Sequence, residues 1–276
     1  VDLMKSYGFK AIFYGFDEPG GNTKLKEQLR MNMLVHELGA EIVNGVFWED
    51  KEKILKETAN RAQSKFDMLA YSMGSHGQED FFSQLPRMAN SEVGHELAYW
   101  HPNLENPIRN RFFMGIWQWA SNLSGVMPHP YMALPHIYKN ARWEESAKGL
   151  TKQYSPFDDW SPFQPPSDLR HLNTVYPSID GPIPTLQWEG IKEGVTDLQY
   201  ILTLDRCVEA GDCAKVEQSA KRVLREIKIY ALSIRNSYLD YKKTAEIGGK
   251  LNEWRYEIKR ILLESDIVTL TPIERR

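Results

Sequence analysis

The chain has few cysteines, no long apolar run and no tract of like charges. Only two of its 276 residues are cysteine, Cys207 and Cys213. Two thiols are too few for a cysteine-based metal site. They can form a local disulfide if the protein is exported, and the cysteines alone do not decide the cellular compartment. No stretch approaches the roughly 18 to 20 apolar residues of a membrane-spanning helix, which excludes a membrane span on this pattern.

The chain also has no excess of positive charge. The net charge is -3, and no basic run offsets it. This balance argues against a nucleic-acid partner. No pair of histidines has helical ligand spacing, no aspartate-rich calcium loop occurs, and Gly20-Gly21 is not followed by the Lys-Ser/Thr of a phosphate loop. The sequence therefore predicts neither a metal nor a cofactor.

Aromatic residues are plentiful, with eight Trp and thirteen Tyr. Aromatic rings stack on sugars, but they fill ordinary cores equally well. An apolar content of 42% and a charged content of 26% are typical of a globular protein with one large domain or two small ones. Because the chain begins at Val1 without a Met or a signal-like segment, we expect it to be part of a longer protein.

Short apolar segments alternate with amphipathic ones in the first half of the chain. The pattern predicts strands over 10–16, 41–48, 66–72, 95–100 and 124–127, with helices over 22–38, 50–63, 78–88 and 107–123. This order implies a parallel sheet in an α/β fold. A closed (β/α)8 barrel needs eight strands, so either the sheet is open or three strands precede Val1. In the second case the predicted strands are strands four to eight.

The second half of the chain has a different character. Residues 129–172 are rich in Pro, Trp, Ser and Asp and predict a long irregular loop near the pocket mouth. Helices are predicted over 186–210, 214–245 and 248–265, the last two as a hairpin packed on the barrel side. The expected domains are a barrel region over 1–206, which includes the loop, and a helical extension over 207–276.

The most informative motif closes the first predicted strand. An apolar run over 9–16 ends in two adjacent carboxylates, Asp17 and Glu18, followed by Pro-Gly-Gly. In a (β/α) barrel the carboxyl ends of the strands carry the catalytic groups. Two carboxylates at such a position predict acid/base chemistry on a glycosidic bond. The alternative is that the pair only begins the next helix, where acidic residues favour the helix dipole.

Three segments resemble one known family. Residues 173–200 contain Tyr-Pro, Gly-Pro-Ile-Pro-Thr and a helix start with Trp-Glu-Gly, and they resemble the C-terminal part of the catalytic domain of glycoside hydrolase family 123. The Phe-Asp-Glu-Pro segment resembles the catalytic strand of that family. Residues 111–125 resemble its helix before the last barrel strand. The resemblance spans roughly residues 8 to 206.

This resemblance implies a (β/α)8 barrel that removes β-linked N-acetylgalactosamine with retention, using the 2-acetamido group of the substrate as nucleophile. Asp17 would orient that group, and Glu18 would be the general acid/base. Adjacent carboxylates cannot easily flank a sugar from opposite faces about 5 Å apart, and substrate assistance removes that need. The implied partner is a glycan or glycoconjugate, and the implied location is outside the cytoplasm.

The chain also departs from the family pattern. Gln187 and Lys192 stand where relatives have Arg, and Val126-Met127-Pro128 replaces an aromatic last strand. Two alternatives therefore stay open. One is a barrel glycosidase acting on a sugar without an acetamido group. The other is an inactive carbohydrate-binding or scaffolding module.

Further residues are candidates for substrate binding because they follow predicted strands or begin helices. Core packing is the alternative for the aromatic residues, a turn role for Asn103, and anchoring of a helix for Arg111. Trp117 and Trp119 lie two apart on a helix and face different directions, so we expect one in the core and one toward the pocket. The candidates are Tyr71, Tyr99, Trp100, Asn103, Arg111, Trp119 and Tyr131.

Overall fold

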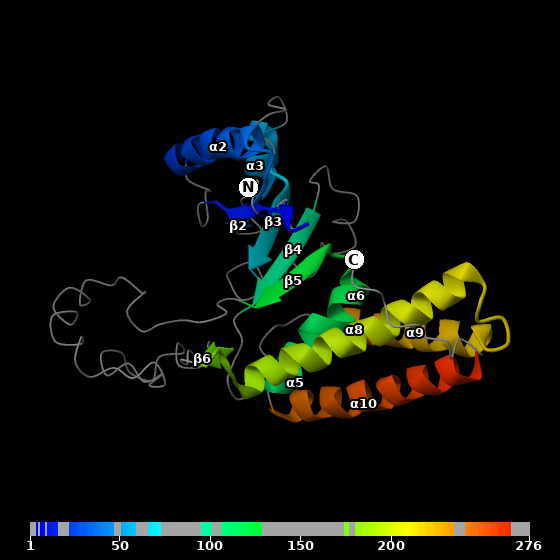
Figure 1. The fold of residues 1–276 in the computed structure, drawn as a ribbon. Coiled ribbons are helices and arrows are strands. Elements are labelled where there is room, and N and C mark those ends of the chain that lie inside the picture. The colour runs from blue at the N-terminus through cyan, green and yellow to red at the C-terminus, as the bar shows by residue number, and fades with distance from the viewer. Residues whose placement is uncertain are drawn as a thin grey trace, which may run out of the picture. The chain divides into compact units, whose positions relative to one another are not determined.

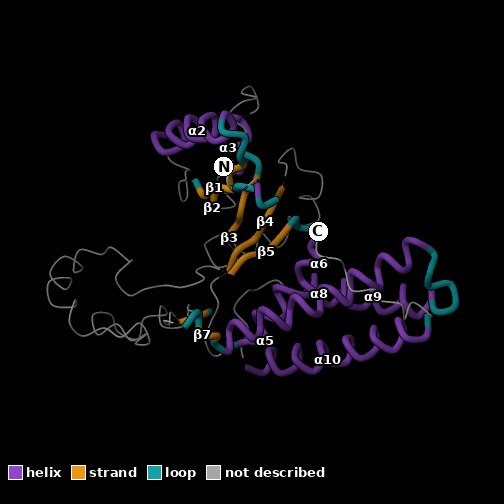
Figure 2. Tube along the Cα trace, viewed as in Figure 1, coloured by secondary structure: helices purple, strands orange, loops and turns teal. Residues whose placement is uncertain are grey.

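The computed structural model describes residues 4, 6–8, 10–15, 22–46, 51–58, 66–72, 95–100, 106–128, 174–176, 180–234 and 241–265. Contacts divide the chain into two compact units (Figures 1 and 2). The first, called here the sheet unit, comprises Val1–Trp100, Ser121–Met127 and Ile234–Tyr238. The second, called the helical unit, comprises His101–Ala120, Pro128–Ser233 and Leu239–Arg276.

A curled parallel sheet organises the sheet unit (Figure 1). Its strands follow one another in space in the order of the chain, and their described ends lie within two residues of the predicted ones. The α/β class and the parallel sheet are therefore confirmed as a five-stranded half-barrel, and the described residues do not include a closed barrel. The strands are β1 Ile12–Tyr14, β2 Glu41–Val46, β3 Met68–Ser72, β4 His95–Trp100 and β5 Gly125–Pro128.

The two faces of the sheet have different neighbours because successive strand residues point to opposite faces. Ile42 packs with Val35 of helix α2, which spans Asn22–Glu37. On the opposite face Val43 packs with Ala70, and further apolar residues of β3, β4 and β5 cover this pair. Helix α2 presents Leu25, Leu29 and Val35 to the interior at helical spacing. Helix α3, Lys51–Thr58, buries Ile54.

Long helices form the helical unit. Helix α8 has the predicted bounds, Leu186–Ala210. It begins where the Thr185 hydroxyl accepts hydrogen bonds from the N–H groups of Gln187 and Trp188, and it ends at Gly211, whose φ of 77° suits glycine. The other elements are α5 Pro107–Phe112, η3 Phe113–Trp117, α6 Gln118–Ser121, β6 Val175–Tyr176, β7 Ile183–Pro184, α9 Glu217–Ser233 and α10 Tyr241–Glu264.

The predictions for two helices are wrong, because neither predicted helix is continuous. The predicted helix over 214–245 is instead two helices, because α9 ends at Ser233 and α10 begins at Tyr241. The predicted helix over 107–123 is interrupted by the π-helical turn η3, in which Gly115 has a non-helical backbone (φ -103°, ψ -105°). A Cβ on Gly115 would lie 2.9 Å from the carbonyl oxygen of Gly194, so close packing against α8 accompanies the interruption.

Glycines also set the contact between α5 and α8. A Cβ on Gly190 would lie 2.9 Å from the carbonyl carbon of Pro107, and one on Gly194 would lie 2.6 Å from the carbonyl oxygen of Arg111. The two backbones therefore touch along one face of α8. Helix α8 thus packs against α5 within the helical unit. The predicted helix over 78–88 and the loop over 129–172 lie outside the described residues.

A disulfide joins Cys207 near the end of α8 to Cys213 in the turn before α9, and both residues are buried. Closing so short a loop is expected to contribute about 2 kcal/mol through the entropy of the unfolded chain. Treatment with a reductant should therefore lower the midpoint of thermal unfolding. A variant with both cysteines changed to Ser should have the lower midpoint and no response to reductant. An unchanged midpoint on reduction of the native protein would contradict a stabilising role.

Candidate active site

The parallel strands end at a common edge of the sheet, where a (β/α) fold places its chemistry. Strand β1 precedes the acidic motif, Asp17-Glu18, in the sequence, and Gly15 is the last residue described before it. Asp17 and Glu18 themselves lie outside the described residues. Asn103 and Tyr131, which follow β4 and β5 in the sequence, also lie outside them.

The end of β1 that precedes Asp17 and Glu18 lies close to buried amide side chains. The Gly15 N–H donates to the carbonyl oxygen of Val43 at 2.9 Å. A Cβ at Gly15 would lie 2.6 Å from both terminal atoms of Gln28 and closer still to Nδ2 of Asn44. Gln28 Nε2 in turn donates to Oδ1 of Asn32 at 2.6 Å. We call Gln28, Asn32 and Asn44, all fully buried, the amide cluster; it lies close to the backbone two residues before Asp17.

The amide cluster was not predicted, although the sequence contains a signal for it. Gln28 and Asn32 stand four residues apart and interrupt the apolar face of α2 formed by Leu25, Leu29 and Val35. Amides on an apolar helical face need buried hydrogen-bond partners. That pattern indicates buried polar contacts on this face of α2, one of which is the bond between Gln28 and Asn32.

Replacing Gly15 with Ala is expected to destabilise the sheet unit by about 1–3 kcal/mol, since the methyl group overlaps the amide cluster. Urea unfolding of the two proteins measures the loss. Gly249→Ala is the matched control, because a Cβ there would meet nothing within 4 Å and the position is helical. The control should be as stable as the native protein or slightly more so. Equal stability of Gly15→Ala would refute the overlap.

Three aromatic candidates lie near the carboxyl ends of β3 and β4. Tyr71 is fully buried, and so are its register neighbours Val46 and Ala98. This burial fits core packing, which is the alternative to substrate binding given above for Tyr71. The backbone register places Tyr99 beside Ser72, the last residue of β3, and Trp100 is the last residue of β4.

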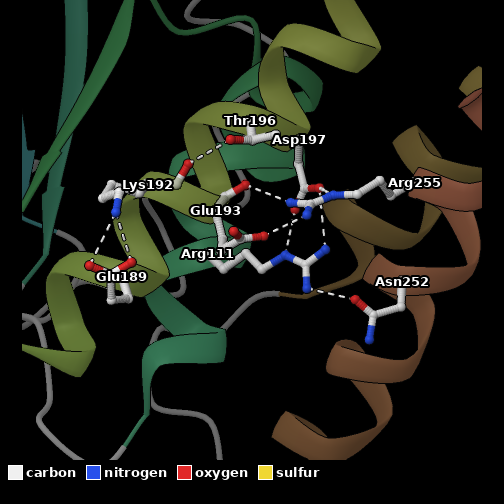
Figure 3. Close-up of polar contacts among 8 residues, drawn as sticks. All are labelled: Arg111, Glu189, Lys192, Glu193, Thr196, Asp197, Asn252 and Arg255. Atoms are coloured by element: carbon white, nitrogen blue, oxygen red, sulfur yellow. Dashed lines mark hydrogen bonds and ion pairs between the residues drawn. The ribbon is translucent and has the colours of Figure 1, made fainter.

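Arg111 is held within the helical unit (Figure 3). Its Nε and Nη2 donate to the two carboxylate oxygens of Asp197 at 2.6 and 3.2 Å, and its Nη1 donates to Oδ1 of Asn252 at 2.7 Å. Arg111 thus joins α5 to α8 and α10 from a position that is 6% exposed. Of the two roles considered for it, these contacts fit the anchoring one.

Of the two tryptophans of this region, one lies in the core as predicted, and the expected approach of the other to a pocket stays a prediction. Trp117 is fully buried and packs edge-on against Phe113 with ring centroids 5.5 Å apart. Trp119 is half-buried, and its Nε1 donates to Asp205 of α8 at 2.9 Å. Lys228 of α9 lies over its ring. The polar edge of Trp119 is therefore engaged by the helical unit.

Gln187, which stands where the family that the sequence resembles has Arg, belongs to the α5–α8 contact. It is fully buried, and its Oε1 accepts a hydrogen bond from Nδ2 of Asn110. Its Nε2 has no hydrogen-bond partner among the described residues. This departure from the family pattern is therefore matched by a local partner in helix packing.

A charged cluster surrounds Asp197 (Figure 3). Arg255 donates to Asp197 and, through Nη1, to Glu193 at 2.5 Å. The hydrogen bond from Arg255 lowers the pKa of Glu193 below its ordinary value of 4.5, against the opposing effect of burial. Burial would lower the pKa of Arg255, but its bonds to Asp197 and Glu193 outweigh this effect and raise it.

The lowered pKa of Glu193 predicts a loss of stability in acid. A carboxyl group with a lower pKa in the folded state stabilises the protein above its unfolded pKa, and that contribution is lost as pH falls through the folded pKa. Urea unfolding from pH 7 to pH 3 should therefore show a decline that begins below about 4.5. Glu193→Gln should have a shallower decline. The same slope in both proteins would exclude this contribution.

No protein-family model matches the chain, and a search of curated proteins finds no significant match. Among the residues described, no group of three or more His, Cys, Asp or Glu side chains is placed to hold a metal ion. Within the same residues, no helix has both the length and the apolar character to cross a bilayer. Asp17 and Glu18, which follow strand β1 in the sequence, therefore remain the strongest indication of function.

Proposed function

We propose that the protein is a retaining glycoside hydrolase that removes β-linked N-acetylhexosamine, with N-acetylgalactosamine preferred, by substrate assistance. The observation that carries this proposal is the position of Asp17 and Glu18, two adjacent carboxylates just beyond the carboxyl end of parallel strand β1. The close approach of Gly15 to the amide cluster supports it, because catalytic groups need a fixed backbone. The choice of N-acetylgalactosamine as the preferred sugar comes from the resemblance to glycoside hydrolase family 123.

In the proposed reaction the two carboxylates have different roles. Glu18 donates a proton to the glycosidic oxygen as the bond to C1 breaks. The carbonyl oxygen of the 2-acetamido group attacks C1 from the opposite face and forms an oxazoline intermediate. Asp17 accepts a hydrogen bond from the acetamido N–H and stabilises the positive charge that develops there. Glu18 then removes a proton from water, which opens the oxazoline with overall retention.

The proposal includes a closed (β/α)8 barrel in which the described strands β1 to β5 are strands four to eight. Tyr99 and Trp100, which end β4, would contact the sugar at the mouth of this barrel, and Asn103 and Tyr131 are further candidates because they follow β4 and β5 in the sequence. Aromatic rings would stack on the sugar face, and the amide would bind a hydroxyl group.

We also propose that the protein works outside the cytoplasm. The buried Cys207–Cys213 disulfide supports this location, because disulfides persist in secreted and periplasmic proteins and are rare in the reducing cytoplasm.

The full-length protein should be assayed on 4-nitrophenyl β-N-acetylgalactosaminide, the matching glucosaminide and the matching β-galactoside. We expect hydrolysis of the two acetamido sugars, the galacto form faster, and inhibition by a thiazoline that mimics the oxazoline intermediate. Hydrolysis of the β-galactoside without thiazoline inhibition would overturn substrate assistance. Binding of sugar with no hydrolysis of any substrate would indicate a carbohydrate-binding module.

A further inference from the structure

The last turn of α2 carries a histidine whose ring contacts the residue before another strand. Nε2 of His36 lies 2.8 Å from Oδ2 of Asp67, which directly precedes β3. The side chains of His36 and Asp67 are 25 and 27% exposed. The contact therefore joins segments 31 residues apart in a setting that is largely shielded from solvent.

The same carboxylate oxygen also binds the start of β2. The Ile42 N–H donates to Oδ2 of Asp67 at 2.9 Å. Ile42 is fully buried and packs with Val35 of α2. Asp67 thus links the end of α2, the start of β2 and the start of β3, and we call the contact of His36 with Asp67 the His–Asp clamp.

The turn between α2 and β2 holds the backbone of the histidine. The Gly39 N–H donates to the carbonyl oxygen of His36 at 2.8 Å, and the Ala40 N–H donates to that of Val35 at 3.1 Å. Gly39 has a φ of 66°, the left-handed conformation in which helices commonly end. His36 therefore approaches Asp67 from a helix end whose backbone is already hydrogen-bonded.

Two features of the clamp favour the positively charged form of the His36 ring. The Asp67 carboxylate is an opposite charge in direct contact, and the carboxyl end of a helix carries a partial negative charge. A neutral ring protonated at Nε2 can also donate to Asp67, but only the charged ring adds an ion pair. The strength of the contact therefore depends on the protonation of His36.

Other titratable groups stand on the neighbouring elements. Glu37 follows His36 and is exposed, and Glu41, the first residue of β2, pairs with Lys10 ahead of β1. His95 begins β4 and stands beside β3 in the backbone register. Glu37 also favours the charged ring, and Glu41 and Lys10 offset each other. His95 has the same ordinary titration range, so a test must resolve His36 individually.

We propose that the His–Asp clamp makes the sheet unit pH-sensitive, as an ion pair in weak acid and a neutral hydrogen bond at higher pH. The folded protein offers His36 a carboxylate and a helix end that the unfolded chain does not. Protonation therefore stabilises the fold, fully below the ordinary histidine pKa of about 6.5, and this contribution is lost as pH rises through the folded value. The clamp does not depend on the proposed catalytic activity.

The effect is distinct in sign and in range from that of Glu193. Protonation of Glu193 weakens the helical unit below about pH 4.5, whereas protonation of His36 strengthens the contacts of α2 in the sheet unit at a higher pH. Stability measured between pH 5.5 and pH 8 therefore reports the clamp without the carboxylate effect.

Proton NMR of the imidazole tests the clamp directly in the 276-residue protein, with His36→Gln used to assign the signal. We expect the His36 ring to titrate above the ordinary value of about 6.5. In Asp67→Asn, which keeps an oxygen for the Ile42 N–H, the ring should titrate at lower pH. Glu37→Gln, which removes an exposed carboxylate from the same helix end, should move the titration far less. A native value at or below 6.5, or the same value in Asp67→Asn, would overturn the proposal.

Urea unfolding at pH 5.5 and pH 8 gives a second readout. Gln at position 36 can donate a hydrogen bond but cannot become charged. On going from pH 5.5 to pH 8, the unfolding equilibrium constant of the native protein should rise about two- to fivefold more than that of His36→Gln. Parallel pH dependence of the two proteins, even with a uniform loss of stability in the variant, would show a merely structural contact and contradict the clamp.

Discussion

Glu18→Gln is expected to reduce kcat/KM by roughly 10²–10⁴-fold on a β-N-acetylgalactosaminide with a sugar or alkyl aglycone, because the amide cannot protonate the leaving oxygen. On the 4-nitrophenyl glycoside the loss should be smaller, since 4-nitrophenolate leaves readily without a proton. Steady-state kinetics on both substrates measure this difference. The matched control is Glu27→Gln, an exposed carboxylate of α2, which should keep full activity.

Asp17→Asn should lower activity on both aglycones alike, by roughly 10²-fold or more. The orientation of the acetamido group is needed whatever the leaving group is, so the loss should not depend on the aglycone. The two variants thus separate proton donation from positioning of the nucleophile. Activity that is indifferent to both substitutions would remove Asp17 and Glu18 from the mechanism.

Asp197→Ala is expected to lower the free energy of unfolding of the helical unit by about 3–5 kcal/mol. The carboxylate is 4% exposed and binds the guanidinium groups of both Arg111 and Arg255, so its removal leaves a buried positive charge without its counter-ion. Urea unfolding followed by circular dichroism measures the loss, because the helices dominate that signal.

The control for Asp197 lies on the same helix. Glu189 pairs with Lys192 at 2.9 Å, and both side chains are about half exposed. An exposed pair of this kind contributes under about 1 kcal/mol. Glu189→Ala should therefore have little effect on unfolding. Equal losses for the two variants would show that Asp197 does not organise the packing of α5, α8 and α10.

Local signals were sufficient to predict much of the fold. Helix α8 has a hydroxyl cap at Thr185 and a terminating glycine at Gly211, and its bounds agree with the prediction. Strand β4 also has the predicted bounds, His95–Trp100. The alternation of apolar strands and amphipathic helices predicts a parallel sheet because parallel strands need crossover helices.

Tertiary packing decides the features that sequence reasoning missed. The π-helical turn at Phe113–Trp117 accompanies the close approach of Gly115 to Gly194, which lies far away in the sequence. The end of α9 at Ser233 was hidden by apolar spacing that continues through Ile227, Ala231 and Ile234. A periodic pattern records which residues are buried, and it does not record where the chain changes direction.

The candidate site also has a part that the sequence predicts and a part that only the tertiary structure shows. Its carboxylates are visible in the sequence because they follow an apolar strand. The amide cluster behind Gly15 depends on the packing of α2 against β2. The partner of Arg111 is Asp197, which lies 86 residues away in the sequence. The sequence alone therefore could not separate an anchoring role from a ligand-binding role for Arg111.

The most direct test of substrate assistance is the rate of hydrolysis of a series of 4-nitrophenyl β-N-acetylgalactosaminides whose acetyl group carries none, one, two or three fluorine atoms. Each fluorine makes the acetamido carbonyl oxygen a weaker nucleophile. The proposed mechanism predicts that kcat/KM falls steeply and steadily along the series. A rate that does not depend on fluorination, or no hydrolysis of the parent compound by the full-length protein, would contradict it.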